Sequence, residues 1–232
     1  MPTSFKLSIA ILVTAGVAGG CAKDPQAVGA AARNEVARQQ MEKDKFQDQT
    51  PVNADTRFAA GQFAEIQGDL PRAIEQYQSS LKINPKHTSA LFALAALYTG
   101  QKQFTPAIDL WNRYIQATNG SAAGYSNLAL TYEMAGKRSE AESAYRLGIA
   151  KDPKNEACRV NYGLMLAREN RTSEATTQLQ TVLTPAETHY DLASIYEAQG
   201  KTVQAKAEYQ KTLEIDPAMT DAKSRLAALD QP

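Results

Sequence analysis

The sequence has little of the chemistry on which catalytic and metal sites depend. Its 232 residues include two cysteines, two histidines and one tryptophan, and they contain no HExxH, P-loop, GxSxG or CxxC motif. Two cysteines cannot supply the four thiolates of a structural zinc site or the framework of a disulfide-rich domain. These absences predict a protein that is not an enzyme and that carries no metal ion or other cofactor.

An excess of charge of one sign is also lacking. Lys and Arg together number 25, and Asp and Glu together number 25. A nucleic-acid-binding protein usually presents a basic face or stripe. We therefore expect no nucleic-acid partner, and nothing in the composition indicates a small-molecule substrate.

Long apolar runs are absent apart from one near the start. Leu7 to Ala18 is an uncharged run of twelve residues that follows a single positive charge at Lys6. A membrane-spanning helix needs about 20 apolar residues, so this run is too short to be one. A short basic segment, an apolar run and small residues before a cleavage point are typical of a secretory signal peptide. Residues 1–20 are therefore predicted to direct export.

The residues around the expected cleavage point add an anchor to this prediction. Ala18, Gly19 and Gly20 directly precede Cys21, and this pattern resembles the lipobox of bacterial lipoproteins. The resemblance implies that Cys21 is lipidated at its sulfur and becomes the first mature residue. The lipobox usually has Leu where this chain has Ala18, so an ordinary cleavage site with an unmodified Cys21 is the alternative. Ala22 is not the Asp that retains some lipoproteins at the inner membrane, which favours an outer-membrane anchor facing the periplasm.

The next segment has too little apolar surface to fold by itself. No Leu or Ile occurs between Ala22 and Asn53, and the stretch alternates charged residues with Gln and Ala. Burial of so few apolar groups cannot offset the entropy lost on ordering the chain. Residues 21–53 are therefore expected to form a lipidated and mostly disordered tether.

Self-similarity along the rest of the chain is the strongest signal. An alanine recurs at intervals of 34 residues, and finally of 30, at Ala73, Ala107, Ala141, Ala175 and Ala205. A large apolar residue follows each alanine by four positions: Tyr77, Trp111, Tyr145, Leu179 and Tyr209. A small residue precedes each alanine by twelve positions: Gly61, Ala95, Ala129, Gly163 and Ala193. The pattern indicates pairs of short amphipathic helices that approach closely at the small residues.

This period and pattern resemble the tetratricopeptide repeat. The resemblance implies an all-α fold, a right-handed α-solenoid of five helix pairs that stack because a single pair cannot bury its own apolar face. The predicted repeats are 54–87, 88–121, 122–155, 156–185 and 186–219. Residues 220–232 are expected to form a helix that covers the last repeat, capped by Thr220 and Asp221, and a short tail.

Two departures from the repeat pattern have structural consequences. Closing prolines follow the second helix in repeats one, three and five, but Asn119 stands in that place in repeat two. Repeat four is four residues short, with Pro185 in the closing place. We therefore expect its second helix to be truncated by about one turn.

The concave groove of such arrays is lined mainly by the first helix of each pair. The resemblance implies a partner-binding groove that includes Phe58, Gln62, Phe92, Asn127, Leu130, Met134, Val160, Asn161, Leu164, Arg168 and Tyr190. Asn127 and Asn161 lie one repeat apart, and each amide could bond the backbone of an extended peptide. The apolar positions would equally suit an amphipathic partner helix. The Lys, Asn and Arg clamp with which one branch of the family grips a C-terminal carboxylate is absent.

These features together predict an exported protein-binding scaffold. The architecture resembles tetratricopeptide lipoproteins that assist pilus or secretion-system assembly, such as pilotins and TadD-like lipoproteins. Two alternatives are a periplasmic holdase that binds many unfolded peptides and a regulatory subunit of an envelope enzyme. His189 and Cys158 are interpreted as packing residues within the repeats, with a reactive thiol as the alternative for Cys158, and His87 lies at a repeat junction.

Overall fold

The computed structural model describes residue 38 and residues 52–230, and only these are considered below. The predicted signal peptide, Cys21 and nearly all of the predicted tether lie outside the described residues. Residues 52–230 contain eleven α-helices and no strand, which confirms the predicted all-α class within that range. None of these helices is both long enough and apolar enough to cross a membrane.

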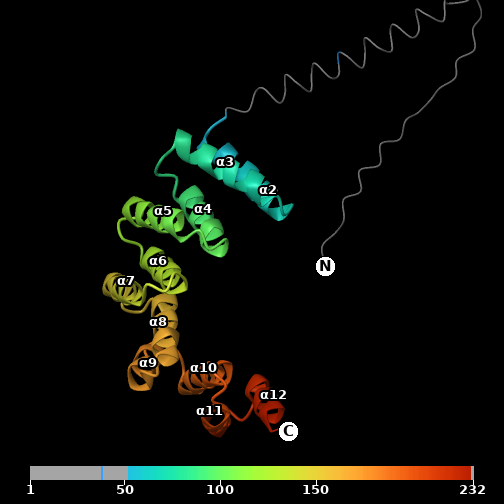
Figure 1. Cartoon of the computed structure of the whole chain (residues 1–232), viewed down its shortest axis with the longest axis vertical. Coiled ribbons are helices and arrows are strands. Elements are labelled where there is room, and N and C mark those ends of the chain that lie inside the picture. Colours follow the sequence, from blue (N-terminus) through green and yellow to red (C-terminus); the bar gives the residue numbers. More distant parts are fainter. Residues whose placement is uncertain (1–37, 39–51, 231–232) are drawn as a thin grey trace, which may run out of the picture. The chain divides into compact units, whose positions relative to one another are not determined.

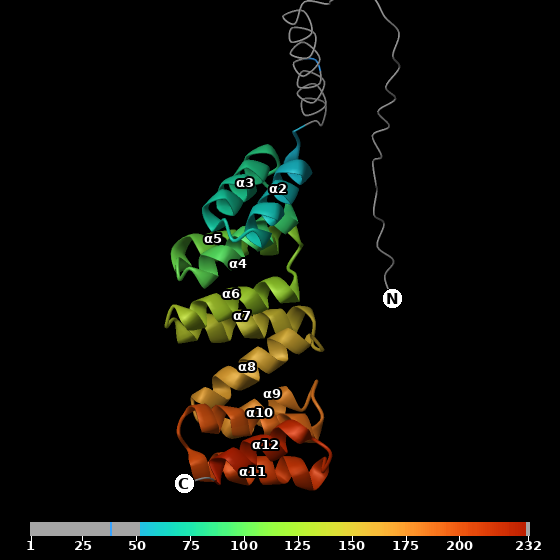
Figure 2. The same cartoon turned by 90° about the vertical axis from the view of Figure 1, so that its right-hand side faces the viewer.

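The helices form five consecutive antiparallel pairs and a final single helix (Figure 1). The pairs are α2 (Ala54–Ile66) with α3 (Leu70–Ile83), α4 (Thr88–Gly100) with α5 (Phe104–Ala117), α6 (Ala122–Met134) with α7 (Arg138–Lys151), α8 (Glu156–Arg168) with α9 (Thr172–Leu179), and α10 (Pro185–Ala198) with α11 (Thr202–Ile215). The last helix is α12 (Thr220–Leu229). Viewed from the side, the pairs stack in chain order as layers of an α-solenoid (Figure 2).

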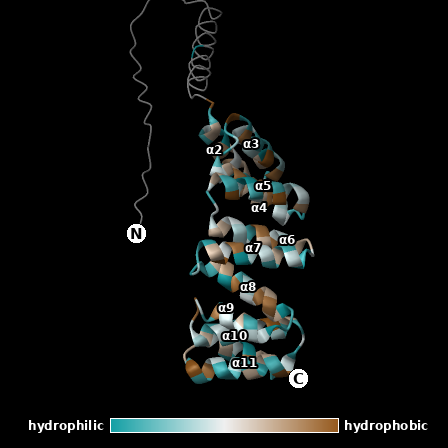
Figure 3. Cartoon of the chain, turned by 90° about the vertical axis from the view of Figure 1, so that its left-hand side faces the viewer, coloured by the Kyte–Doolittle hydropathy of each residue, from teal (hydrophilic) through white to brown (hydrophobic). Residues whose placement is uncertain are grey.

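The repeated small and large residues form the core, as predicted from their spacing. The large side chains at Tyr77, Tyr145, Leu179 and Tyr209 are fully buried, and Trp111 is 2% exposed. The small residues opposite them leave no spare room, because a Cβ atom built on Gly61 would lie 2.5 Å from the ring of Tyr77. Hydrophobic and hydrophilic residues are mixed along the helices (Figure 3), and each helix contributes buried residues to the core.

The apolar core has two parts. The larger cluster runs from Ala64 in α2 to Leu192 in α10. A smaller cluster joins α10, α11 and α12 through Ala193, Ala205, Tyr209 and Ala222. In α12, Ala222 is fully buried while Leu226 and Leu229 pack against this cluster, so α12 covers the last pair as expected.

The start of α12 differs from the prediction. Its N-cap residue is Met219, no side chain caps the helix, and Thr220 is already the first helical residue. The sequence predicted Thr220 and Asp221 as the cap because both are good capping residues. The closing Asp216-Pro217 turn places the helix start one residue earlier than that rule suggests.

The second helix of repeat four is shorter than predicted. α9 has 8 residues, whereas α3, α5, α7 and α11 have 14 each. The difference of six residues is about 1.7 turns, or about 9 Å of helix. Pro185 does not close α9 as predicted. It is the first residue of α10, behind a capping box in which Thr184 and Glu187 bond each other's backbone N–H, a place where the missing N–H of proline costs little.

The turn inside every pair has the same geometry. The chain takes a positive φ after each first helix, at Gly68, Lys102, Gly136, Asn170 and Gly200. The N–H of the next residue then donates back to a carbonyl of the helix, at 2.8–2.9 Å in all five pairs, which closes the helix end. Sequence inspection found this turn only where it contains glycine.

Lys102 is the residue least suited to this turn. Its φ of 59° is left-handed, which costs a non-glycine residue about 1–2 kcal/mol. We expect Lys102→Gly to raise the free energy of unfolding by about 0.5–1 kcal/mol, since glycine removes this strain but gives the unfolded chain more freedom. Thermal unfolding followed by circular dichroism measures the change. Gly136→Lys is the matched control and should lower the midpoint; an unchanged midpoint in both variants would contradict the strain argument.

Candidate functional site

The predicted groove residues lie on the first helices of the five pairs. α2 carries Phe58 and Gln62, and α4 carries Phe92. α6, α8 and α10 carry the others: Asn127, Leu130, Met134, Val160, Asn161, Leu164, Arg168 and Tyr190. Three of the apolar side chains are conspicuously exposed, Phe92 at 40%, Leu130 at 36% and Met134 at 45%. The first helices therefore present an apolar face to solvent.

This face contains a pocket of about 740 Å³ between α2 and α4. It brings together three of the predicted residues, Phe58, Gln62 and Phe92. The remaining lining is mostly apolar and includes Ile66, Ala96 and Tyr114. A cavity with apolar walls and a few polar groups is the usual form of a binding site.

Aromatic contacts hold the walls of this pocket in place. The ring centroid of Phe58 lies 5.5 Å from that of Tyr77 and 5.3 Å from that of His87. On the opposite side Phe92 makes edge contacts with Trp111 at 5.1 Å and Tyr114 at 5.6 Å. Such ring pairs add about 0.5–1.5 kcal/mol each beyond burial. The pocket is therefore built on core residues and is formed before any partner arrives.

The two groove asparagines are less available than predicted. The amide nitrogen of Asn127 donates to the carbonyl of Ala123 at 2.9 Å. The amide nitrogen of Asn161 donates to the hydroxyl of Ser126 at 3.2 Å. Each amide therefore keeps its oxygen and one N–H for a partner peptide.

Three other predicted groove residues already have partners inside the chain. Val160 packs against the larger apolar cluster, and Tyr190 lies over Tyr209 with ring centroids 5.7 Å apart. Arg168 forms an ion pair with Glu133. The structure thus brings the N-terminal members of the predicted set into one pocket, while several C-terminal members serve the stacking of repeats.

A hydrogen bond that sequence inspection missed links the two helices of most pairs. The hydroxyls of Tyr77, Tyr145 and Tyr209 donate to the glutamates twelve residues earlier at 2.7, 3.5 and 2.7 Å. The accepting residues are Glu65, Glu133 and Glu197. In repeat two the indole N–H of Trp111 donates to Thr99, also twelve residues earlier, at 3.2 Å.

Each of these hydrogen bonds gives the polar group of a buried aromatic residue a partner. Burial is the main cause that raises the pKa of Tyr77 and of Tyr145, and the nearby carboxylate raises it further. The same two causes raise the pKa of Tyr209 to about 12. Repeat four has Leu179 and Ala167 at these places and needs no bond. The spacing of twelve residues was therefore a readable signal, since Glu or Thr is present wherever the core residue has a polar group.

Comparison with known families identifies the repeat. Residues 57–130 and, separately, residues 186–219 match models described as tetratricopeptide repeat. The helix pairs within these two ranges are tetratricopeptide repeats.

Relatives and solved structures agree with this at the level of fold. A thermophilic tetratricopeptide protein of Thermus thermophilus superposes with a TM-score of 0.54 and 22% identity, covering 76% of this chain and 98% of its own. YrrB, described as a tetratricopeptide protein with an unusual peptide-binding site, gives a TM-score of 0.55 and 17% identity over 78% of this chain and 95% of its own. A tetratricopeptide repeat protein of Parabacteroides merdae gives a TM-score of 0.56 and 16% identity, over 87% of this chain and 80% of its own.

One curated relative matches by sequence. The general transcriptional corepressor ssn6 of Schizosaccharomyces pombe is 29% identical over 119 residues, which make up 50% of this chain and 11% of the relative. Because this chain spans about a tenth of that protein, the match concerns shared tetratricopeptide repeats.

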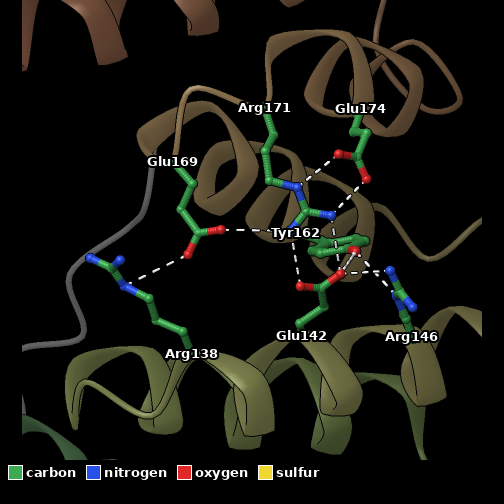
Figure 4. A network of polar contacts seen from close by, with 7 residues as sticks. All are labelled: Arg138, Glu142, Arg146, Tyr162, Glu169, Arg171 and Glu174. Atoms are coloured by element: carbon green, nitrogen blue, oxygen red, sulfur yellow. Dashed lines mark hydrogen bonds and ion pairs between the residues drawn. The ribbon is translucent and has the colours of Figure 1, made fainter.

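A cluster of charged residues joins repeats three and four (Figure 4). Glu142 of α7 accepts from Arg171, the residue at the N-cap position of α9, at 2.9 and 3.2 Å, and from the hydroxyl of Tyr162 at 2.8 Å. Arg146 adds a contact at 2.6 Å. The pKa of Glu142 is lowered to about 2, chiefly by the hydrogen bonds from Arg171 and also by the positive charges of Arg171 and Arg146. This carboxylate therefore stabilises the junction of the two repeats.

The junction should weaken in acid. A carboxyl whose pKa is lowered on folding contributes stability above its unfolded pKa, and loses it as the pH falls toward the folded pKa. We expect about 2 kcal/mol of unfolding free energy to be lost between about pH 5 and about pH 2, and we expect Glu142→Gln to remove this dependence. Urea unfolding at several pH values measures it. Glu140→Gln, an exposed neighbour on α7, should leave the pH dependence as it is; an identical loss in the Glu142→Gln protein would contradict the assignment.

The histidines and Cys158 have structural partners within the repeats. His87 caps α4 by accepting from the N–H of Ala90 at 3.1 Å, and its other ring nitrogen contacts Asp55 at 2.9 Å. His189 contacts Glu208 at 2.6 Å. Cys158 is fully buried, and burial raises the pKa of its thiol. In the part of the chain that the structure describes, no three His, Cys, Asp or Glu residues converge as metal ligands would.

Proposed function

We propose that this chain is a protein-binding scaffold whose partner occupies the face formed by the first helices. The pocket between α2 and α4 is the observation that carries the proposal, because it joins exposed aromatic surface to a rigid wall of core residues. A preformed apolar groove loses little entropy on binding an extended or helical segment. The neighbour YrrB is described as having a peptide-binding site, which supports the same class of partner.

The proposal includes a place in the cell. The chain is a lipoprotein anchored through Cys21 at the cell envelope, where its repeats face the periplasm and assist assembly of a pilus or secretion system. The apolar run before Cys21 and the small residues between them support export and anchoring. These residues lie outside those that the structure describes.

Capture of the partner tests the binding proposal. The full chain, expressed in its own host, should retain a partner in stoichiometric amount, and Phe92→Asp should abolish retention because a charge then enters the pocket wall. Leu147→Asp is the matched control, since Leu147 is 51% exposed but lies on α7, a second helix. Equal loss in both variants would contradict the groove as the site. Weak capture of many peptides would instead favour the holdase alternative.

Anchoring has an independent test. We expect the wild-type chain to fractionate with membranes and to carry a mass increase that corresponds to lipid on Cys21, and Cys21→Ser should release it. A Cys21→Ser protein that remains membrane-bound with an unchanged mass would contradict the lipoprotein proposal while leaving the binding proposal intact.

A further inference from the structure

Three glutamates occupy equivalent places in repeats one, three and five, and one of them differs from the other two. Glu65, Glu133 and Glu197 all accept from a tyrosine hydroxyl of their own repeat. Glu133 is also paired with Arg168, and Glu197 with Arg225 at 3.3 Å. Within residues 52–230 no cation pairs with Glu65.

The difference between Glu65 and Glu133 follows from one residue of the next repeat. Arg168 reaches Glu133 from thirty-five residues further along the chain. The residue at that spacing from Glu65 is Gly100, the last residue of α4. Gly100 has no side chain that could reach Glu65 as Arg168 reaches Glu133, and a Cβ atom built on Gly100 would have no other atom within 4 Å.

Glu65 also lies in the pocket between α2 and α4. It is the single charged residue of the pocket lining, whose other members are apolar or neutral. Phe58 and Phe92 supply aromatic surface in the same pocket, and Ile66 is 81% exposed at its edge. The pocket therefore offers one negative charge surrounded by aromatic and aliphatic surface.

We infer that this pocket takes an arginine side chain of a partner polypeptide, with apolar residues beside it in the partner sequence. The guanidinium would pair with Glu65 as Arg168 pairs with Glu133, and its flat faces would lie against the aromatic side chains. Arginine suits both contacts better than lysine, because its planar fork pairs with carboxylates and stacks on rings. The flanking apolar residues would cover Ile66 and Ala96. This inference rests on the proposed function and narrows it to a class of sequence.

Selection from a random short-peptide phage library tests the inference with the full chain as bait. We expect selected peptides to share an arginine next to aliphatic or aromatic residues. A synthetic peptide of that consensus should bind roughly tenfold more weakly when its arginine is replaced by glutamine. Glu65→Gln should cause a similar loss while still accepting from Tyr77, and Glu133→Gln, at the equivalent place in repeat three, should not.

A second variant imitates the internal pair. Gly100→Arg places a guanidinium where Arg168 stands relative to Glu133, so it should compete for Glu65 and weaken the consensus peptide roughly tenfold. Gly100→Gln is the neutral control and should bind nearly as the wild type does. Circular dichroism of each variant verifies that the repeats remain folded.

The outcomes separate this inference from the proposed function. The inference would be overturned if the selected peptides bound in the groove without a preference for arginine, or if Glu65→Gln and Gly100→Arg left their affinity unchanged. The scaffold proposal would stand in either case. A library that yields no groove-binding peptide would count against both.

Discussion

Replacing Trp111 by alanine should cost about 3–5 kcal/mol of unfolding free energy, the loss typical of a large core aromatic residue. Trp111 is 2% exposed, and Phe92 and Tyr114 both contact its ring edge-on. The change would leave a cavity between α4 and α5 and would remove the support behind Phe92. We expect the thermal midpoint to fall by about 10 °C, measured by circular dichroism.

Trp111→Phe is the control for this prediction. It keeps a ring beside Phe92 and removes the indole N–H that donates to Thr99, whose hydroxyl retains its bond to Thr131 at 3.0 Å. The loss should therefore be less than half of that for alanine. If both variants lost the same stability, the hydrogen bond rather than the packing of Trp111 would be the main contribution.

The second large effect is expected at Gly148, where three helices meet. A Cβ atom at this position of α7 would lie 2.5 Å from the sulfur of Cys158 in α8, 3.1 Å from the Cβ of Tyr125 and 3.3 Å from the carbonyl oxygen of Ala122, both in α6. Two of these neighbours are rigid parts of α6. We expect Gly148→Ala to cost about 2–3 kcal/mol, since overpacking outweighs the helix propensity gained.

A double variant tests the cause. Cys158→Ala removes the nearest atom, so Gly148→Ala combined with Cys158→Ala should be more stable than Gly148→Ala alone. Gly100→Ala is the control, because nothing lies near that position, and it should be neutral or slightly stabilising. Urea unfolding of the wild type, Gly148→Ala, Cys158→Ala and the double variant gives the coupling energy between the two positions. Strictly additive losses would show that the sulfur is not the obstacle.

The spacing of the repeated residues predicted the fold because residues at those intervals share the buried face of a helix. The alanine, the small residue and the large residue of each repeat recur in register, and each of those positions is buried in the structure. Periodicity assigns a residue to a face of a helix, and stacking of identical faces then follows. The five helix pairs and the covering α12 could therefore be anticipated from residues alone.

The polar partners could not be anticipated in the same way. Nothing in the hydrophobic pattern indicates that Arg171 would bond Glu142 from 29 residues away, or that Lys102 would take a left-handed conformation. The predicted groove residues lie on the first helices of the pairs, as expected, but the prediction assigns the side chains of Asn127, Asn161 and Arg168 to a partner although each has a bond within the chain. Periodicity predicts which face of a helix a residue occupies, but it does not predict the rotamer of the side chain.

The short α9 also affects how the solenoid unfolds. With six fewer residues in that helix, repeat four offers less apolar surface to repeat five, and polar contacts such as Thr172 with Tyr196 at 2.8 Å and Gln199 with the carbonyl of Arg168 at 2.9 Å bridge the junction. A linear array is only as cooperative as its weakest nearest-neighbour interface. The last repeat and α12 share an apolar cluster of their own, and we therefore expect them to open as a subglobal unit before the first four repeats unfold.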